Sequence, residues 1–338
     1  MQLLVELSCE YPSLPQSEFT ACLEANSITH TLLSANKRLL VVDLGKLEGE
    51  EIKQLSERLS LSFTISKLLK ATRITTEHAL HDILSTARDI DLPAGSFRVR
   101  ARIYDKQCIT EKSDELEKKI GELWPNHPVN LSNPASELRV VVSGGVAHLG
   151  LKLTSIDRSQ YERRKPQFRP FFSPISLHPR LARALVNLTQ IREGEKLLDP
   201  FCGTGGFLVE GGLIGAKVFG SDIQEKMVDG CKKNLNHYGI KDYEIECKDV
   251  GGINFSSMDG VVTDFPYGRA SKSVGERHLL FNKAFQSIRH SMKDGGISVT
   301  GLPDRESVEL GKKHLKLQAI YPCYVHKNLT RHFAVWKK

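Results

Sequence analysis

The sequence predicts an α/β protein, with a parallel sheet in the C-terminal half and smaller α+β units before it. Two observations predict that sheet. Short apolar strands and amphipathic helices alternate through the C-terminal half at the spacing of βαβ units. A glycine-rich turn, PFCGTGG, follows the first of these strands, where open α/β sheets bind their ligands. The length of 338 residues fits two or three domains.

The elements of the C-terminal half follow one another in a regular order. A short strand ends at Asp199, and the helix over 225–238 ends at Gly239, a residue typical of helix ends. The remaining strands are expected at 217–221, 243–247, 261–263 and 297–300, the helices at 207–214 and 276–292, and a terminal hairpin at 319–326 and 332–336.

The N-terminal half is less regular and reads as two small α+β units. The segment 155–178 carries three prolines and a cluster of arginine and lysine, which indicates a linker between the halves. The expected elements are strands at 3–7, 39–44, 97–103, 138–142 and 146–153, and helices at 16–25, 50–59 and 113–123.

Composition narrows the class of protein. The chain is 40% hydrophobic and 26% charged, which is ordinary for a globular protein, and its formal net charge of +7 favours a polyanionic partner. Its seven cysteines contain no C-x-x-C pair, so we expect reduced thiols and neither a zinc finger nor a disulfide framework. The first residues carry no basic n-region, so we expect no signal peptide, and no apolar run reaches the ~18 residues of a membrane span. We therefore expect a soluble, cytoplasmic monomer without a metal.

The glycine-rich turn and two later strand ends predict a cofactor site. The turn has neither the G-x-G-x-x-G nor the G-x-x-x-x-G-K-S/T spacing, which disfavours a phosphate cradle. Asp222 ends the second strand, where a carboxylate can accept both ribose hydroxyls, and Asp249 ends the third, within reach of an adenine edge. These features fit a nucleoside without phosphates, such as S-adenosylmethionine; the alternative is that the aspartates only cap turns. The candidate residues are Asp199, Pro200, Cys202, Gly203, Thr204, Gly205, Asp222, Ile223, Asp249 and Val250.

A second candidate site, Asp264-Phe265-Pro266-Tyr267, follows the fourth strand. The exocyclic amine of a base is a poor nucleophile, because its lone pair is delocalised into the ring. The Asp264 carboxylate can accept one N–H, and the carbonyl of Phe265 or Pro266 the other, which localises that lone pair. Tyr267 offers a ring on which the base can stack, and Pro266 fixes the loop. The alternative is an ordinary turn at a strand end.

This tetrapeptide resembles the (Asp/Asn/Ser)-Pro-Pro-(Tyr/Phe) motif of methyltransferases that modify exocyclic amines of bases. Phe265 stands where that motif has its first proline. A proline would hold the carbonyl more rigidly, so we expect Phe265→Pro to retain or raise activity. The alternative is that Phe265 packs against the incoming base.

Longer runs resemble the archaeal tRNA guanine-10 N2-methyltransferases. They are RKPQFRPFFSPISLHPRLARALVNL, LLDPFCGTGGFLVEGGLIGAKVFGSDI and VVTDFPYGRAS, within residues 164–271. In addition, VNLSNPASELRVVVSGGVAHLGL resembles the end of a THUMP domain, a tRNA-binding module. The resemblance implies a ferredoxin-like domain at 1–58, a THUMP domain at 59–154, a linker at 155–178 and a Rossmann-fold methyltransferase domain at 179–338. It also implies tRNA as the substrate.

Basic side chains indicate where RNA could bind. Three arginines alternate within SFRVRARI and so share one face of a strand, and others crowd the linker or follow the catalytic loop. Phosphate contact is the functional interpretation, and a solvated surface is the alternative. The candidates are Arg98, Arg100, Arg102, Arg163, Arg164, Lys165 and Arg269.

Three functions stay open at this point. The first is a tRNA guanine N2-methyltransferase that adds one or two methyl groups. The second is an amino-methyltransferase of ribosomal RNA or DNA, and the third is a catalytically silent tRNA-binding protein. For the first, we expect residues 160–338 alone to bind the cofactor but to methylate tRNA poorly.

Overall fold

The computed structural model describes residues 1–45, 49–173, 176–266, 274–326 and 329–338. The chain divides into two compact units, and the second takes in two short stretches of the N-terminal part. The first, here called the sheet unit, holds Met1–Pro12, Ile28–Glu57 and Ser62–Asp157. The second, here called the C-terminal unit, holds Ser13–Ser27, Arg58–Leu61 and Arg158–Lys338.

One sheet runs through the whole sheet unit, in the order β2-β3-β1-β4-β7-β6-β5. Strand β4 pairs with β1 on one side and with β7 on the other, so strands from 1–58 and from 59–154 share it. The division into ferredoxin-like and THUMP domains stays a prediction. The strands are β1 (Gln2–Leu7), β2 (His30–Ala35), β3 (Leu39–Leu44), β4 (Ser62–Arg73), β5 (Phe97–Ile103), β6 (Ser136–Ser143) and β7 (Val146–Ser155).

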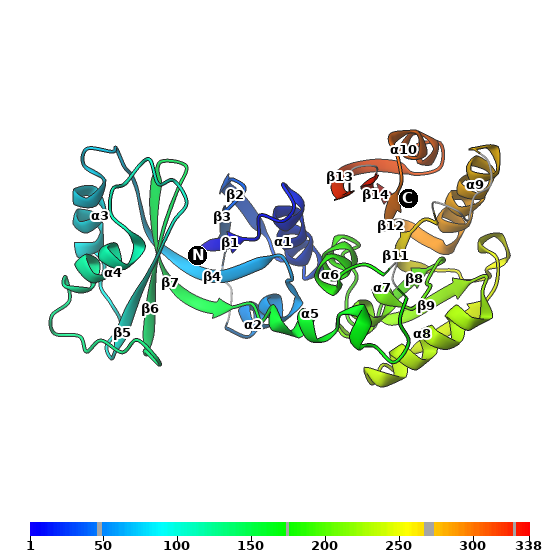
Figure 1. Cartoon of the computed structure of the whole chain (residues 1–338), viewed down its shortest axis with the longest axis horizontal. Coiled ribbons are helices and arrows are strands. Elements are labelled where there is room, and N and C mark those ends of the chain that lie inside the picture. Colours follow the sequence, from blue (N-terminus) through cyan, green and yellow to red (C-terminus); the bar gives the residue numbers. More distant parts are fainter. Residues whose placement is uncertain (46–48, 174–175, 267–273, 327–328) are drawn as a thin grey trace. The chain divides into compact units, whose positions relative to one another are not determined.

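Helices α3 (Ala79–Arg88) and α4 (Ser113–Gly121) pack beside β5, β6 and β7 (Figure 1). Ile83 of α3 and Leu116 of α4 are fully buried with Leu138 of β6 in one apolar cluster. Because side chains alternate across a strand, this cluster takes one face of the sheet, and Val141 of β6 joins a second apolar cluster with Leu4 and Val41 on the other face. Helix α2 spans Gly49–Arg58.

The C-terminal unit holds a second sheet, ordered β10-β9-β8-β11-β12-β14-β13. The pairs from β10 to β12 are parallel, and β14 runs antiparallel to both of its neighbours. The strand order reverses at β8, which creates a crevice at its carboxyl end. The strands are β8 (Lys196–Asp199), β9 (Lys217–Asp222), β10 (Tyr243–Cys247), β11 (Met258–Asp264), β12 (Met292–Leu302), β13 (Lys316–His326) and β14 (Leu329–Lys337).

Helices cover both faces of this second sheet. Leu197 of β8 lies against Gly211 of α7, whereas Leu198 joins a buried cluster with Phe281 and Phe285 of α9. Successive side chains of a strand point to opposite faces, so α7 and α9 lie on opposite sides. The helices are α1 (Leu14–Ala25), α5 (Ser159–Arg163), η1 (Pro166–Phe168), α6 (Pro179–Leu188), α7 (Gly206–Gly212), α8 (Glu225–His237), η2 (Val250–Gly252), α9 (Val274–Ser291) and α10 (Arg305–Gly311).

Helix α1 belongs to the C-terminal unit, although its sequence lies in the predicted first domain. Its Glu18 is fully buried and accepts hydrogen bonds from the amides of Ser60 and Leu61, at 2.9 and 2.8 Å, and from Asn187 of α6, at 2.9 Å. These hydrogen bonds offset the unfavourable free energy of burying a carboxylate. Helix α1 is therefore an integral part of this unit.

The expected βαβ series after Asp199 corresponds to β8 through β12. The sequence interpretation missed β2, β4, α3, α6 and α10. Helix α6 has a recognisable start, since Pro179 occupies its first turn and the Arg180 amide donates to His178 at 3.2 Å. The predicted linker contains α5 and η1 and is thus partly ordered.

Candidate active site

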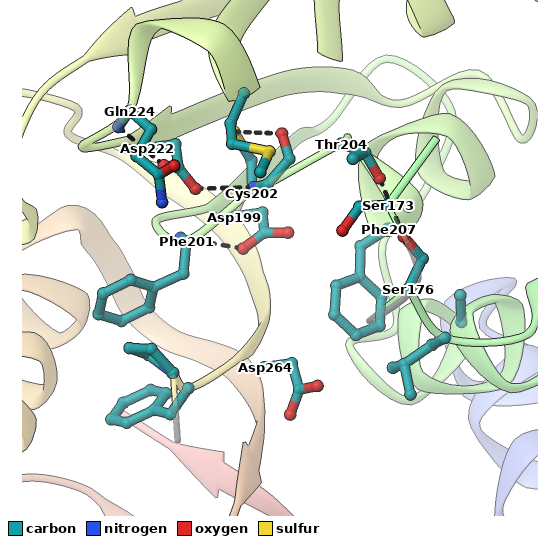
Figure 2. Close-up of a pocket in the computed structure, with 17 residues that line it drawn as sticks. Ser173, Ser176, Asp199, Phe201, Cys202, Thr204, Phe207, Asp222, Gln224 and Asp264 are labelled. Carbon is teal, nitrogen blue, oxygen red and sulfur yellow. Dashed lines mark hydrogen bonds between the residues drawn. The ribbon is translucent and has the colours of Figure 1, made fainter. Parts of the chain in front are cut away.

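A pocket of about 280 Å³ opens at the carboxyl ends of β8, β9 and β11, where the strand order reverses (Figure 2). Ligands of open α/β sheets bind in this crevice. In Figure 2, Asp199 and Asp264 lie between the rings of Phe201 and Phe207. The polar side chains that line the pocket belong to Ser173, Ser176, Asp199, Thr204, Asp222, Gln224 and Asp264.

The glycine-rich turn forms the floor between β8 and α7. Gly203 and Gly205 have φ of 49° and 80°, in the left-handed region that favours glycine. At Gly205 a Cβ would also come within 2.6 Å of the Cys231 sulfur, so α8 packs directly against the turn. The amide of Cys202 donates to the Ser221 carbonyl at 2.9 Å, which ties the turn to β9. Among the predicted cofactor residues here, Cys202, Gly203 and Thr204 line the pocket.

Asp222 joins the ends of β8 and β9. One of its oxygens accepts the Gly203 amide at 3.1 Å, and the other accepts the Gln224 amide at 2.9 Å (Figure 2). Each carboxylate oxygen can accept a further hydrogen bond. Asp222 thus faces the pocket in a fixed orientation, with acceptor capacity for a hydroxyl pair.

Asp199 is buried at the end of β8, 2% exposed. One of its oxygens accepts the Thr263 hydroxyl at 2.7 Å and the Phe201 amide at 3.1 Å. Burial raises the pKa of Asp199 to about 7, although these two hydrogen bonds oppose the rise. A carboxyl group poised near neutrality is typical of a functional site.

The charge of the pocket fits S-adenosylmethionine. Among its described lining residues are three aspartates, and none is lysine, arginine or histidine. Among these described lining residues, phosphate groups would meet carboxylates and no cationic side chain, whereas a sulfonium cation and a ribose diol suit carboxylates. The structure thus supports a phosphate-free nucleoside over a dinucleotide.

Asp264 ends β11 at the same pocket. Its side chain is 19% exposed, and its Oδ2 lies 3.3 Å from Nη1 of Arg331 in β14. A Cβ at Gly301 of β12 would collide with Oδ1 of Asp264, so the carboxylate lies directly over that glycine. Burial raises the pKa of Asp264 to about 6, and the charge of Arg331 opposes that rise.

Phe265 is part of the core, with 1% of its surface exposed. Its ring lies 5.4, 4.9 and 5.0 Å from the ring centroids of Phe201, Phe281 and Phe285, and its amide donates to the Gly301 carbonyl at 2.9 Å. A proline would remove both the ring and the donor. The packing therefore argues against the expectation that Phe265→Pro retains or raises activity, which itself stays a prediction.

Of the two remaining residues of the motif, the structure describes Pro266 but not Tyr267. Pro266 lines the pocket beside Phe265. Tyr267 lies outside the described residues, as does Arg269. Their predicted roles in base stacking and phosphate contact stay predictions.

The remaining predicted cofactor residues lie around the pocket. The Pro200 carbonyl accepts the Ser221 hydroxyl at 3.1 Å, and Ile223 is 68% exposed just after Asp222. Asp249 caps η2 by accepting the Gly251 amide at 2.9 Å, and it pairs with Lys283 of α9. The hydrogen bond from Lys283 lowers the pKa of Asp249. Neither Asp249 nor the buried Val250 is among the described lining residues, so their contact with a nucleoside stays a prediction.

The three predicted RNA contacts on β5 form ion pairs inside the sheet unit. Such ion pairs do not prevent phosphate binding, but they reduce the net positive charge that would attract a phosphate. The pairs are Arg98 with Glu137, Arg100 with Glu117 and Arg102 with Glu6, at N···O distances of 2.5, 2.9 and 3.9 Å.

The predicted contacts in the segment after β7 separate into two kinds. Arg164 is 9% exposed and pairs with the fully buried Glu210 of α7 at 2.9 Å, so it is removed from the proposed RNA-contacting set. Arg163 is exposed, and half-buried Lys165 pairs with Glu162 at 2.5 Å. Those two stay predictions.

Sequence reasoning missed several residues of the pocket. Ser173 and Ser176 come from the predicted linker, and the Ser176 hydroxyl lies 3.1 Å from that of Thr204. Arg331 lies 67 positions after Asp264 in the sequence, and nothing in its local pattern connects the two. Only the pairing of β11, β12 and β14 brings them together.

Comparisons with known proteins identify the family. The model of the RMKL-like methyltransferase domain (UPF0020) matches residues 166–332, which include the whole described pocket lining. The tRNA (guanine(10)-N2)-dimethyltransferases of Methanothermobacter thermautotrophicus and Pyrococcus abyssi are 32% and 33% identical to this chain. Each match covers 98% of this chain and 98% of the relative. The chain belongs to this family. As a member of the tRNA (guanine(10)-N2)-dimethyltransferase family, it is a methyltransferase that uses S-adenosylmethionine.

A solved structure supports the fold of this family member along its full length. The crystal structure of TrmN from Thermus thermophilus matches with a TM-score of 0.60 at 22% identity, over 100% of both chains. The Rossmann-fold methyltransferase domain and the α+β region before it are thus confirmed as a fold. Among the described residues, no helix is long and apolar enough to cross a membrane. Within the same residues, no group of three or more histidine, cysteine, aspartate or glutamate side chains is arranged to hold a metal ion.

Proposed function

We propose that the protein transfers methyl groups from S-adenosylmethionine to the exocyclic N2 amine of a guanine in tRNA, with guanine 10 as the target. The observation that carries this proposal is the placement of Asp264 in the same pocket as the glycine-rich turn and Asp222. The names of relatives that match over 98% of their length supply the substrate class.

The chain's own residues would hold the cofactor at the carboxyl ends of β8 and β9. S-adenosylmethionine, when bound, supplies an electrophilic methyl group on a sulfonium centre. Asp222 would accept the ribose hydroxyls with its remaining lone pairs, and exposed Ile223 would lie against the adenine. The Asp199 carboxylate would interact favourably with the positive charge of the sulfonium. The backbone of the turn would lie close to the cofactor, because Gly203 and Gly205 have no side chain to prevent a close approach.

Asp264 would prepare the amine for transfer. Its carboxylate accepts one N–H of the guanine N2, and the Phe265 or Pro266 carbonyl accepts the other. As the new N–C bond forms, positive charge grows on the nitrogen, and the carboxylate is placed to take the proton that leaves. A carboxylate that acts mainly in the transition state raises turnover rather than substrate affinity.

The sheet unit would supply tRNA binding, as the THUMP resemblance implies. Lys67, Lys70 and Arg73 of β4 are exposed, and they are additional candidates for phosphate contact. Arg102, 47% exposed, lies over the Phe63 ring at 5.5 Å, where it can also reach outward. Action as a monomer in the cytoplasm stays a prediction of the sequence.

Product mapping tests the substrate. Unmodified tRNA with a guanine at position 10 is incubated with the protein and labelled S-adenosylmethionine, then digested and analysed by mass spectrometry. We expect N2-methylated or N2,N2-dimethylated guanosine at position 10, and no product from a matched tRNA with adenine there. Label at another guanine would contradict the target. No label on tRNA, together with transfer to ribosomal RNA or DNA in parallel incubations, would favour the second function.

A further inference from the structure

Arg331 is a buried arginine beside the proposed catalytic carboxylate. Its side chain is 9% exposed, and Nη1 lies 3.3 Å from Asp264 Oδ2. Strand β14 runs antiparallel to β12, so its first residues lie at the carboxyl ends of the parallel strands, which form the pocket rim. The terminal hairpin thus brings a cation to the one place where the mechanism needs a fixed carboxylate.

The backbone of β12 limits the carboxylate from the other direction. Asp264 is the register partner of Gly301, which in turn is the register partner of Phe333 in β14. A Cβ at Gly301 would collide with Oδ1 of Asp264. The carboxylate is therefore held between the bare backbone of Gly301 and the guanidinium of Arg331.

We propose that Arg331 is a positioning residue for methyl transfer, whose guanidinium orients the Asp264 carboxylate toward the target amine and keeps it charged. The proposal rests on the proposed function of Asp264. Arginine suits this role, because its planar fork stays charged and fixes a carboxylate in one orientation.

The charges around Asp264 determine in which direction the loss of Arg331 would shift the pKa of Asp264. Burial raises the pKa of Asp264 to about 6, and Arg331 on β14 opposes that rise. From the end of β8, ionised Asp199 carries a charge of the same sign as that of Asp264, and the bare backbone of Gly301 in β12 lies against the Asp264 carboxylate. Removal of the cation should therefore raise the pKa of Asp264 further. Because the ionised form accepts the N–H, the acid limb of the rate should move to higher pH.

The first experiment measures single-turnover methyl transfer against pH, at saturating tRNA and S-adenosylmethionine. For Arg331→Gln we expect the acid midpoint to rise by about 1 unit, the low end of the effect of a neighbouring opposite charge. Arg331→Lys keeps the charge but loses the fork, so its midpoint should stay near that of the unchanged protein while its rate falls. The exposed Arg305→Gln is the matched control, with both values unchanged.

A second variant separates geometry from charge. Gly301→Ala should displace the carboxylate by its methyl group while Arg331 remains, so the rate should fall without the same rise in midpoint. Affinity for S-adenosylmethionine should stay within about twofold in every variant, because Arg331 is not among the described lining residues.

A direct titration keeps this proposal distinct from the proposed function. Aspartate labelled with ¹³C at the side-chain carboxyl reports each midpoint by NMR, and the Asp264 signal is identified by its loss in Asp264→Asn. A higher midpoint in Arg331→Gln supports the coupling even if no tRNA accepts a methyl group. Equal midpoints and equal transfer rates would overturn the role of Arg331. So would a midpoint in Arg331→Lys about 1 unit above that of the unchanged protein, and this variant decides the matter if Arg331→Gln does not fold.

Discussion

At the scale of single residues, the catalytic loop depends on an aromatic ring beneath it. Phe265 packs against Phe201 of the cofactor turn and against Phe281 and Phe285 of α9. We expect this ring, together with the hydrogen bond from the Phe265 amide to the Gly301 carbonyl, to hold the backbone of the loop in place. At this position the related motif has a proline, whose ring fixes the backbone. Here the packing of Phe265 stabilises the backbone instead.

Replacement of Phe265 tests this view. Phe265→Pro should lower the free energy of unfolding by about 3–5 kcal/mol, the cost of removing a buried phenyl ring, and lose a backbone hydrogen bond in addition. Phe265→Leu keeps most of the apolar volume and the donor, so its loss should be much smaller. Urea unfolding monitored by circular dichroism measures both. A proline variant as stable as the unchanged protein would refute the packing role.

Single residues also show how far the sequence can be read. Asp264 and Asp222 could be recognised, because a strand end followed by a turn places a carboxylate at a known edge of a parallel sheet. Arg331 could not, since its nearness to Asp264 depends on the register of three strands. The pairing of Asp249 with Lys283 was equally hidden, because α9 lies far along the chain.

At the scale of elements, helix α1 completes the C-terminal unit from the opposite end of the sequence. Its buried Glu18 accepts donors from Ser60, Leu61 and Asn187. A fragment of residues 160–338 would leave Asn187 of α6 buried without this acceptor and would expose the apolar face of α6. We therefore withdraw the expectation that this fragment still binds the cofactor.

Glu18 provides the test in the intact protein. Glu18→Ala should lower the free energy of unfolding by roughly 3 kcal/mol or more, because several buried donors lose their acceptor at about 1–3 kcal/mol each. The exposed Glu57→Ala is the matched control and should change stability little. Thermal unfolding of both variants measures the difference. A Glu18 variant that unfolds with the control would show that α1 is only loosely attached.

The contact of α1 with α6 lay beyond sequence reasoning for a physical reason. Helical periodicity marks an apolar face but does not say which partner covers it. Strand β4 was missed for a related reason, since the run SFTISKLLKATR has no clean alternation and its pairing is interrupted by bulges. Tertiary contacts decide such elements.

At the scale of the whole molecule, the pocket lies in one unit, and we propose that most tRNA contacts lie in the other. The described pocket lining lies within residues 173–266, whereas the proposed tRNA-binding surface belongs to the sheet unit. The sequence predicted the parallel sheet around the pocket, because strands and helices alternate there at the spacing of βαβ units. It did not predict the single sheet that joins strands from 1–58 and 59–154.

The most direct test of the account is single-turnover methyl transfer by Asp264→Ala to unmodified tRNA. We expect the rate to fall by about 10²–10⁴, the usual contribution of a positioned acid or base, while tRNA and S-adenosylmethionine affinities stay nearly unchanged. The unchanged protein should lose rate as pH falls through about 6, when Asp264 takes up a proton. A variant that transfers methyl groups at the normal rate would contradict the role of Asp264. A wild-type protein that binds both ligands and modifies no tRNA would instead support the silent binder.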